Sequence, residues 1–244
     1  MRSCLMTLCR LLCQVLTFPL HLMEVTGLYG RYKCLFPYFA YNITFSYNDK
    51  MHEVKRDLFR NVGKFASSGG ALHLLELGCG SGANFSFYPY GCTVTCTDPN
   101  PHFEKYLRIN MGANDHLTYD RFMVVSGEDM KDIKDESVDV VVCTSVLCSV
   151  SDVAQVLQEV RRILKAGGAF YFLEHVVSDT SSWIYFFQCV FEPLWYYLAD
   201  GCMITRATWK YLEAASFSEL HLKHIEAPEV TVLIRPHIMG YAIK

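Results

Sequence analysis

The chain has 244 residues, about half of them apolar, and a formal net charge of −3. This length is sufficient for one sizeable α/β domain with appendages and a full hydrophobic core. The slightly acidic balance and the absence of Lys/Arg blocks exclude the positive surface that nucleic-acid-binding proteins use, so nucleic acid is not an expected partner.

Eleven cysteines are scattered along the chain, and none belongs to a C-x-x-C pair. Such a set fits neither a disulfide framework nor a zinc site, so we expect a reducing compartment and no metal. Sequons for N-glycosylation begin at Asn42 and Asn84. A glycan at Asn84 would block a glycine-rich loop beside it, so the domain is expected to face the cytosol.

The first 47 residues are unlike the rest of the chain and are predicted to form a membrane anchor and linker. A helix over the 19 residues from Leu11 to Tyr29 would be about 28 Å long, close to the thickness of the bilayer hydrocarbon layer. Pro19 and basic flanking residues make a re-entrant or interfacial hairpin at least as compatible as a spanning helix. A signal peptide fits less well, because no A-x-A-like pair follows, and a buried core helix is the remaining alternative.

The remainder, from residue 48 onward, has the pattern of alternating strands and helices. Asn48 to Phe65 is predicted to be an amphipathic helix, Ser67 to Gly70 a flexible joint, and Asp152 to Lys165 a second helix. The expected strands are Ala71–Leu77, Thr93–Thr97, Phe122–Val125, Val138–Thr144 and Ala169–Val177, followed by a closing hairpin of residues 219–227 and 237–244. This order is typical of an α/β protein with a doubly wound parallel sheet.

A glycine-rich loop follows the first predicted strand. Gly78, Gly80 and Gly82 stand at alternate positions, and Glu76 lies two residues ahead of them. Glycines at this place allow positive φ and a close approach of the backbone to a nucleotide-like ligand. With Ala83, the loop also satisfies the G-x-G-x-x-G/A pattern, so on its own it leaves a dinucleotide site open, as well as a turn without a ligand.

Asp98 ends the second predicted strand, twenty residues after Gly78. A carboxylate at this place can accept both hydroxyls of a ribose, and Pro99 and Asn100 stiffen the turn that aims it. An exposed turn aspartate is the alternative, which the spacing to the glycine loop disfavours.

Two further carboxylates, Glu128 and Asp129, follow the third predicted strand. Either one is suited to accept the exocyclic amine of adenine, although acidic loops are often merely solvated. Coming after Glu76 and Asp98, this pair completes an order that a dinucleotide dehydrogenase does not need. Glu76 is the residue that distinguishes this pattern from that of a dinucleotide dehydrogenase.

The E-x-G-x-G-x-G sequence, the strand-end aspartate and the G-E-D triplet together resemble a class I S-adenosylmethionine-dependent methyltransferase. The strings GANFSFYPYGCTVTCTDPNPHFEKYL, VLCSV, DGC and RPHIMGYAIK, with the apolar N-terminus, resemble the membrane-bound alkyl-thiol S-methyltransferases of the methyltransferase-like seven group. The resemblance covers nearly the full chain. It implies a seven-stranded, mostly parallel, Rossmann-like sheet, with residues 48–244 as the methyltransferase domain.

The resemblance also implies a cofactor, a substrate and a location. The donor would be S-adenosylmethionine, and the acceptors would be small apolar thiols. The protein would contact membrane lipid at the endoplasmic reticulum and at lipid droplets, with its catalytic domain facing the cytosol.

By the same resemblance, the glycine loop and Glu76 would line the methionine moiety of the donor, Asp98 the ribose and the later acidic pair the adenine. Thr144 and Ser145 would form the floor near the methyl group, although relatives tend to carry a larger apolar residue in place of Ser145. The expected cofactor-binding residues are Glu76, Gly78, Cys79, Gly80, Gly82, Asp98, Pro99, Asn100, Glu128, Asp129, Thr144 and Ser145.

Methyl transfer from a sulfonium asks for a nucleophile that is close, aligned and unprotonated. A free thiol has a pKa of about 8.5 and is already a few per cent thiolate at neutral pH, so no dedicated base is required. His175, at the end of the fifth predicted strand, is the best-placed catalytic candidate to accept a proton, with a purely structural strand-end histidine as the alternative. His237 and Cys148 are weaker candidates.

The segment from Ser181 to Ile204 is rich in aromatic residues and follows the fifth predicted strand. It is expected to cover an apolar substrate pocket or to rest on the membrane, with core packing as the alternative. Two rival functions stay open: methylation of carbon or oxygen in a lipid such as a quinone, and membrane or lipid-droplet recruitment with an idle catalytic site. The intact Glu76, Asp98 and Glu128 argue against the idle site.

Overall fold

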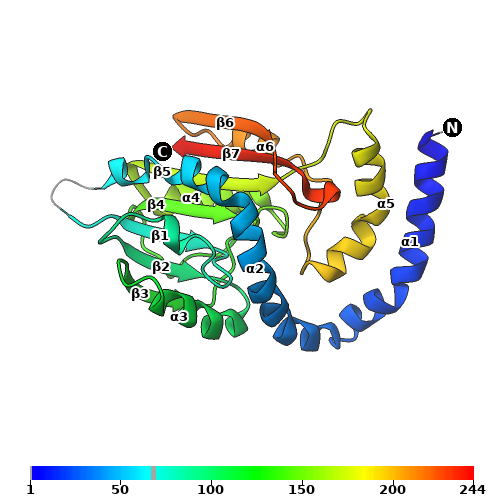
Figure 1. The fold of residues 1–244 in the computed structure, drawn as a ribbon, viewed down its shortest axis with the longest axis horizontal. Coiled ribbons are helices and arrows are strands. Elements are labelled where there is room, and N and C mark those ends of the chain that lie inside the picture. Colours follow the sequence, from blue (N-terminus) through cyan, green and yellow to red (C-terminus); the bar gives the residue numbers. More distant parts are fainter. Residues whose placement is uncertain (1, 67–69) are drawn as a thin grey trace.

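The computed structural model describes residues 2–66 and 70–244, and its central element is a seven-stranded sheet with the order β3-β2-β1-β4-β5-β7-β6. The strands are β1 (His73–Leu77), β2 (Thr93–Thr97), β3 (Thr118–Met123), β4 (Val138–Thr144), β5 (Leu164–His175), β6 (Glu219–Glu226) and β7 (Pro236–Ile243). The first five strands are parallel, and β7 is antiparallel to both of its neighbours. The predicted α/β fold with a mostly parallel sheet is confirmed (Figure 1).

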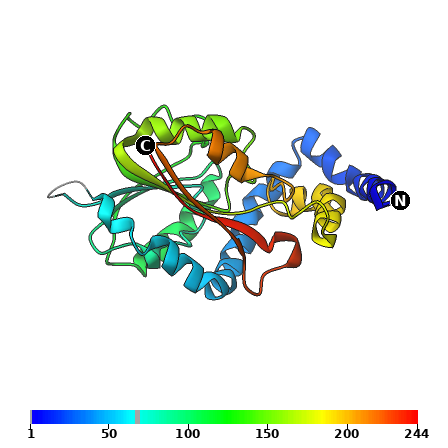
Figure 2. The same cartoon turned by 90° about the horizontal axis from the view of Figure 1, so that it is seen from above.

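Helices cover both faces of the sheet (Figure 2). The helices are α1 (Arg2–Val25), α2 (Tyr29–Phe59), α3 (Glu104–Gly112), α4 (Val153–Ile163), α5 (Trp183–Leu198) and α6 (Thr208–Ala214), and short 3-10 helices span Val62–Phe65, Phe85–Phe87, Pro101–Phe103 and Val232–Ile234. The C-terminal half of α2 and α3 pack on one face, while α4 and α6 pack on the other. The result is a three-layer arrangement.

The central strands are buried on both sides, which explains their continuous apolar sequence. In β4, Val140 and Val142 belong to the core on the α2 side, whereas Val141 and Cys143 belong to the core on the α4 side. This is the pattern expected of parallel strands between two helix layers. By contrast, β3 begins four residues before the predicted start at Phe122. It is an edge strand with polar, half-exposed residues, so it lacks the continuous apolar run that marks the central strands.

The helix predicted from Asp152 to Lys165 forms as α4, but it is shorter at its C-terminal end. The Asp152 side chain caps its start by accepting a hydrogen bond from the Gln155 amide at 3.0 Å. Leu164 already belongs to β5. The predicted closing hairpin is present as the antiparallel pair β6 and β7.

Helix α1 and the first half of α2 extend away from the sheet, and α1 lies beside α5 (Figures 1 and 2). Gly27, with φ +76°, lies in the turn between α1 and α2. At this corner the Tyr29 hydroxyl donates to the Tyr197 carbonyl at 2.6 Å, and the Tyr32 hydroxyl donates to the Leu198 carbonyl at 2.7 Å. Among the described residues, α1 is the one helix long and apolar enough to cross a membrane, and 6% of its most apolar window is buried.

Helix α2 runs without interruption across the predicted domain boundary at residue 48. Its first half lies near α5, and its second half packs on the sheet through Met51 and Leu58. The predicted amphipathic helix is therefore the C-terminal half of a longer one, followed by the short helix that ends at Phe65. The joint predicted at Ser67 to Gly70 lies, except for Gly70, outside the described residues.

Candidate active site

A cavity of about 790 Å³ opens at the carboxyl ends of the parallel strands, where open α/β sheets bind their ligands. Its volume lies within the range of roughly 300–1,000 Å³ that is usual for small-molecule sites. Residues at the ends of all five parallel strands contribute to its wall, together with α2 and α5. The predicted site residues that line it are Glu76, Gly78, Cys79, Gly80, Asp98, Pro99, Glu128, Thr144, Ser145 and His175.

Three predicted cofactor-binding residues lie outside this wall. Gly82 serves the packing of the loop, because a Cβ at its position would lie 2.3 Å from the Phe85 ring. Asn100 caps the following 3-10 helix and donates to a backbone carbonyl of α2 at 2.8 Å. Asp129 is exposed and forms an ion pair with Lys131 at 3.0 Å. Only Glu128 of the predicted acidic pair therefore faces the cavity.

The glycine loop and Asp98 form one structural unit. One carboxylate oxygen of Asp98 accepts from the Gly80 amide at 3.0 Å, and the other accepts from the Asn100 amide at 2.8 Å. Gly78 has φ +58°, and a Cβ there would lie 2.5 Å from the Val146 side chain, so no larger residue fits. Burial raises the pKa of Asp98 to about 6, against the effect of its two backbone hydrogen bonds. The carboxylate is thus fixed at the cavity wall.

Glu76 is buried beside the loop and has both carboxylate oxygens occupied. Asn84 donates to one oxygen at 2.8 Å, and the Tyr88 hydroxyl donates to the other at 2.9 Å. Burial raises the pKa of Glu76 to about 7, although these donors and the charge of Lys55 oppose the shift. Asn84 is fully buried, so a glycan on its side chain would be incompatible with this fold.

Lys55 is a cavity residue that the sequence analysis missed. Its side chain is 1% exposed, and its ammonium donates to the Asn48 side-chain oxygen at 2.7 Å and to the Ala83 carbonyl at 3.4 Å. Burial lowers its pKa to about 8, and the nearby Glu76 carboxylate opposes this shift. A lysine inside the apolar stripe of α2, between Met51 and Leu58, was the signal that could have revealed it.

Ser145 adopts a left-handed conformation at the end of β4, with φ +57°. Its amide donates to the Leu173 carbonyl at 2.9 Å. The Asn84 side chain donates to the hydroxyl of the preceding Thr144 at 3.0 Å and to Glu76 at 2.8 Å. A non-glycine residue in this region is strained and persists where the surroundings fix it. The cavity floor is therefore rigid at this point.

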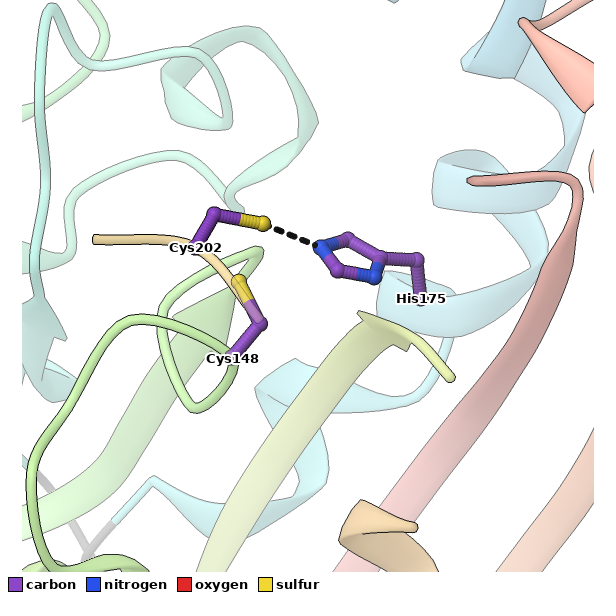
Figure 3. A group of neighbouring side chains, drawn as sticks. All are labelled: Cys148, His175 and Cys202. Atoms are coloured by element: carbon purple, nitrogen blue, oxygen red, sulfur yellow. Dashed lines mark hydrogen bonds between the residues drawn. The ribbon is translucent and has the colours of Figure 1, made fainter. Parts of the chain in front are cut away.

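The histidine and cysteine candidates meet at the other end of the cavity, together with one cysteine that the sequence analysis did not select. The Nε2 atom of His175 lies 3.0 Å from the Cys202 sulfur, and Cys148 is adjacent to both (Figure 3). Burial disfavours the charged imidazole of His175, but the neighbouring Cys148 outweighs it, so the pKa of His175 is raised. His237, paired with His175 across β5 and β7, has its pKa lowered to about 4 by burial.

Helices α2 and α5 close this end with apolar and aromatic side chains. Phe36, Phe39 and Ile43 from α2 line the cavity, as do Trp195 and Leu198 from α5. The aromatic segment was expected either to cover a pocket or to rest on the membrane. Its C-terminal part does contribute to the pocket wall, so the two ends of the cavity differ: one is polar and built on the glycine loop, and the other is mostly apolar.

Comparison with known proteins agrees with this geometry. Residues 75–172 match the family model of the methyltransferase domain. The human thiol S-methyltransferase TMT1A is 56% identical over 209 residues, which are 86% of this chain and 86% of that protein. The human thiol S-methyltransferase TMT1B is 51% identical over 241 residues, which are 98% of this chain and 99% of that protein.

Solved structures resemble the chain in fold. A SAM-dependent methyltransferase, possibly a histamine N-methyltransferase, from Thermotoga maritima is 16% identical, with a TM-score of 0.58 over 86% of this chain and 98% of that one. Geranyl diphosphate methyltransferase in complex with GPP and sinefungin is also 16% identical, with a TM-score of 0.57 over 79% of this chain and 77% of that one. At these identities the likeness concerns the fold alone.

Proposed function

Since the chain belongs to the thiol S-methyltransferase family and is a methyltransferase, we propose that it transfers a methyl group from S-adenosylmethionine to the sulfur of small apolar thiols at the cytosolic face of a membrane. The observation that carries this proposal is the single cavity that joins the Asp98 carboxylate to an apolar end lined by α2 and α5. A polar donor and an apolar acceptor then fit side by side.

The donor end carries charges that complement S-adenosylmethionine. Asp98 is proposed to accept both ribose hydroxyls, since its oxygens are aimed by the amides of Gly80 and Asn100. Lys55 supplies a buried cation that suits the methionine carboxylate, and Glu76 supplies an anion that suits the methionine ammonium group. Glu128 lines the cavity as the proposed partner of the adenine. When bound, the donor supplies a methyl group on a cationic sulfonium.

The acceptor end suits a small apolar nucleophile. Thiolate is the reacting form of a thiol, and a pKa of about 8.5 makes it available near neutral pH. The aromatic side chains of α2 and α5 exclude water, which strengthens the attraction between thiolate and sulfonium. His175 is proposed to assist deprotonation, because its imidazole lines this end of the cavity.

The outer surface of the N-terminal helices supports attachment to a membrane. Large apolar side chains of α1, the turn after it, α2 up to Phe45 and α5 are exposed, namely Leu5, Leu8, Leu11, Leu12, Val15, Leu16, Phe18, Leu22, Met23, Val25, Leu28, Leu35, Tyr38, Phe39, Ile43, Phe45, Trp183, Phe187, Phe191 and Leu198. An apolar surface of this extent marks an interaction site. We call these side chains the lipid-facing surface.

Three charged residues of α1 contact α5 or the segment just before it. Arg2 donates to the Ser181 carbonyl at 2.6 Å, Arg10 lies 3.5 Å from Glu192, and Glu24 accepts from Tyr196 at 3.2 Å. A helix with polar contacts along one side and lipid on the other lies in the interface, so an interfacial anchor is proposed over a spanning one. Phe39 and Ile43 belong both to this surface and to the cavity wall, which gives apolar acceptors a short way in from lipid.

The cytosolic orientation rests on the eleven free cysteines and on the buried sequon at Asn84. The endoplasmic reticulum membrane and lipid droplets are the proposed locations on the family resemblance.

The alternative acceptor is carbon or oxygen of a lipid such as a quinone, a reaction that depends on a positioned base. The test is incubation of the purified full-length protein in detergent with labelled donor and a panel of aliphatic thiols, phenols and quinones, followed by product masses. We expect labelled methyl thioethers, and none with Asp98→Ala. Turnover of a quinone or phenol with no thiol methylated would overturn the proposal.

A further inference from the structure

Three side chains that commonly bind metal ions meet at the acceptor end of the cavity. Cys148 lies in the loop after β4, His175 ends β5, and Cys202 follows α5 (Figure 3). One ligand atom from each lies within 4.8 Å of the other two, and all three residues are buried. The two cysteines are far from one another in the sequence, so a search for C-x-x-C pairs does not find this group.

The spacing of these atoms fits a tetrahedral zinc ion. Zn–S bonds of about 2.3 Å and Zn–N bonds of about 2.0–2.1 Å place neighbouring ligand atoms roughly 3.5–3.8 Å apart. The Nε2 atom of His175 lies 3.0 Å from the Cys202 sulfur, and the largest separation in the group stays within 4.8 Å. Shifts of a few tenths of an ångström to about 1 Å, within the reach of side-chain rotation, bring the three atoms to these separations.

The backbone already holds the two cysteine loops together. The Met203 amide donates to the Cys148 carbonyl at 3.0 Å. Arg206 donates to the carbonyls of Leu147 at 2.6 Å and Val150 at 2.7 Å, on either side of Cys148. A binding site is effective when its ligands are positioned in advance by such supporting contacts.

Each sulfur also has a polar neighbour that suits a thiolate. The Trp195 indole donates to the Cys202 sulfur at 3.2 Å, and the Ser149 hydroxyl lies 3.5 Å from the Cys148 sulfur. Supporting donors of this kind orient metal ligands and tune their basicity. Because the three ligand residues and Trp195 all line the cavity, a fourth coordination position would face the acceptor.

We propose that Cys148, His175 and Cys202 bind Zn²⁺ and that the fourth position takes the sulfur of the acceptor thiol. The metal site stands on its own geometry, whereas the identity of the fourth ligand rests on the proposed function. In this role His175 assists deprotonation as a zinc ligand rather than as a free base.

The charges and atoms of the reaction balance. Zn²⁺ with two thiolates and a neutral imidazole has no net charge. When the acceptor thiol binds, its S–H bond breaks, its proton leaves to water and a Zn–S bond forms, because a coordinating thiol is deprotonated. The resulting single negative charge matches the positive sulfonium. Transfer then forms the new C–S bond while the donor C–S bond breaks, and the neutral thioether dissociates from the zinc.

The first test measures metal content directly. Full-length protein in detergent, prepared without chelators, is analysed for zinc, then stripped and titrated with Zn²⁺ alone against a chromogenic chelator. We expect about one zinc per chain, and an affinity loss of at least about tenfold in Cys202→Ser and in Cys148→Ser. Cys189→Ser, which removes another buried cysteine from the neighbouring helix α5, is the matched control and should keep the wild-type value. Wild-type protein that fails to bind Zn²⁺, or a Cys148–Cys202 disulfide in protein prepared anaerobically, would overturn the metal site.

The second test examines the fourth ligand with Co²⁺ in place of zinc. The thiolate-to-cobalt absorption band should gain intensity when an alkyl thiol is added and stay constant with the matched alcohol. A band whose intensity does not change when the thiol is added would overturn the assignment of the fourth ligand. Zinc binding without methylation of any thiol would refute the proposed function and leave the metal site. Thiol methylation by zinc-free protein at the wild-type rate would refute the binding of the acceptor thiol to zinc and leave the proposed function.

Discussion

The donor and acceptor ends of the cavity are assembled in different ways. The donor end is centred on a short stretch of sequence, Glu76 to Asp98, in which two neighbouring strand ends and one glycine loop are linked by hydrogen bonds. The acceptor end collects Phe39, Cys148, His175, Cys202 and His237 from separate parts of the chain. The donor site is centred on one short stretch of sequence, whereas the acceptor site is formed by tertiary packing. Residues of the acceptor site can therefore vary while the donor site stays the same.

If the two ends are independent, a change at one should leave the other intact, and the largest effect is expected at Asp98. Replacement by Ala removes the two charge-assisted hydrogen bonds that we propose to the ribose, each worth about 1.5–3 kcal/mol, so affinity for S-adenosylhomocysteine should fall roughly a hundredfold or more. Titration calorimetry measures this. Asp129→Ala, at an exposed carboxylate outside the cavity wall, is the control and should bind normally. Equal affinities in a folded Asp98→Ala protein would remove Asp98 from the donor site.

His175→Gln should produce the opposite pattern. Turnover of an alkyl thiol should fall by about tenfold or more, because the imidazole lies at the acceptor end, 3.0 Å from the Cys202 sulfur. Affinity for S-adenosylhomocysteine should stay within about twofold of wild type, which is within ordinary scatter for a residue that does not contact the donor. Steady-state kinetics and calorimetry on the same preparation provide both values. A variant that loses donor binding as well would show that the two ends are coupled.

Acid should weaken the binding of the donor. Burial raises the pKa of Asp98 to about 6, and only the ionised carboxylate offers both of its oxygens as charged acceptors to the two hydroxyls. Between pH 7 and pH 5 the ionised fraction falls by about tenfold, so donor affinity should fall by a similar factor. Glu76, whose pKa is raised to about 7 by burial, titrates in the same range, and a difference between wild type and Asp98→Asn isolates the Asp98 contribution. Affinity that is constant from pH 7 to pH 5 would contradict an ionised Asp98 at the ribose.

The smallest effect is expected on the lipid-facing surface. Leu16 is 79% exposed on α1, so Leu16→Ser should leave stability and donor affinity unchanged. It should weaken binding to vesicles by about 1 kcal/mol, or roughly fivefold, since part of the burial of one leucine in the interface is lost. Flotation with lipid vesicles measures the change, and Gln14→Ser on the same helix is the control. Unchanged flotation of Leu16→Ser would place α1 away from lipid.

The same difference between the ends explains what the sequence could predict. The glycine spacing and Asp98 were predicted because their geometry is fixed within two adjacent strands, and the sheet followed from its continuous apolar runs. Lys55 and Cys202 were not selected, since each reaches the cavity only through the packing of α2 or α5. Gly82 and Asp129 were selected by motif, but one serves loop packing and the other faces solvent.

The boundary of the N-terminal segment also could not be predicted from a local sequence pattern. The expected division at residue 48 falls within α2, which is continuous from Tyr29 to Phe59. Its first half presents apolar residues outward and its second half presents them to the sheet. Which neighbour each half meets is decided by tertiary structure, so periodicity alone suggested two segments where one helix exists.

We propose that sulfur is the atom methylated at the acceptor end. A competition experiment tests it most directly: full-length protein in detergent receives isotopically labelled donor with equal amounts of an alkyl thiol and the alcohol of the same chain length, and the products are resolved by mass. We expect label in the methyl thioether and none in the ether. Label in the ether with the thiol unchanged would contradict it.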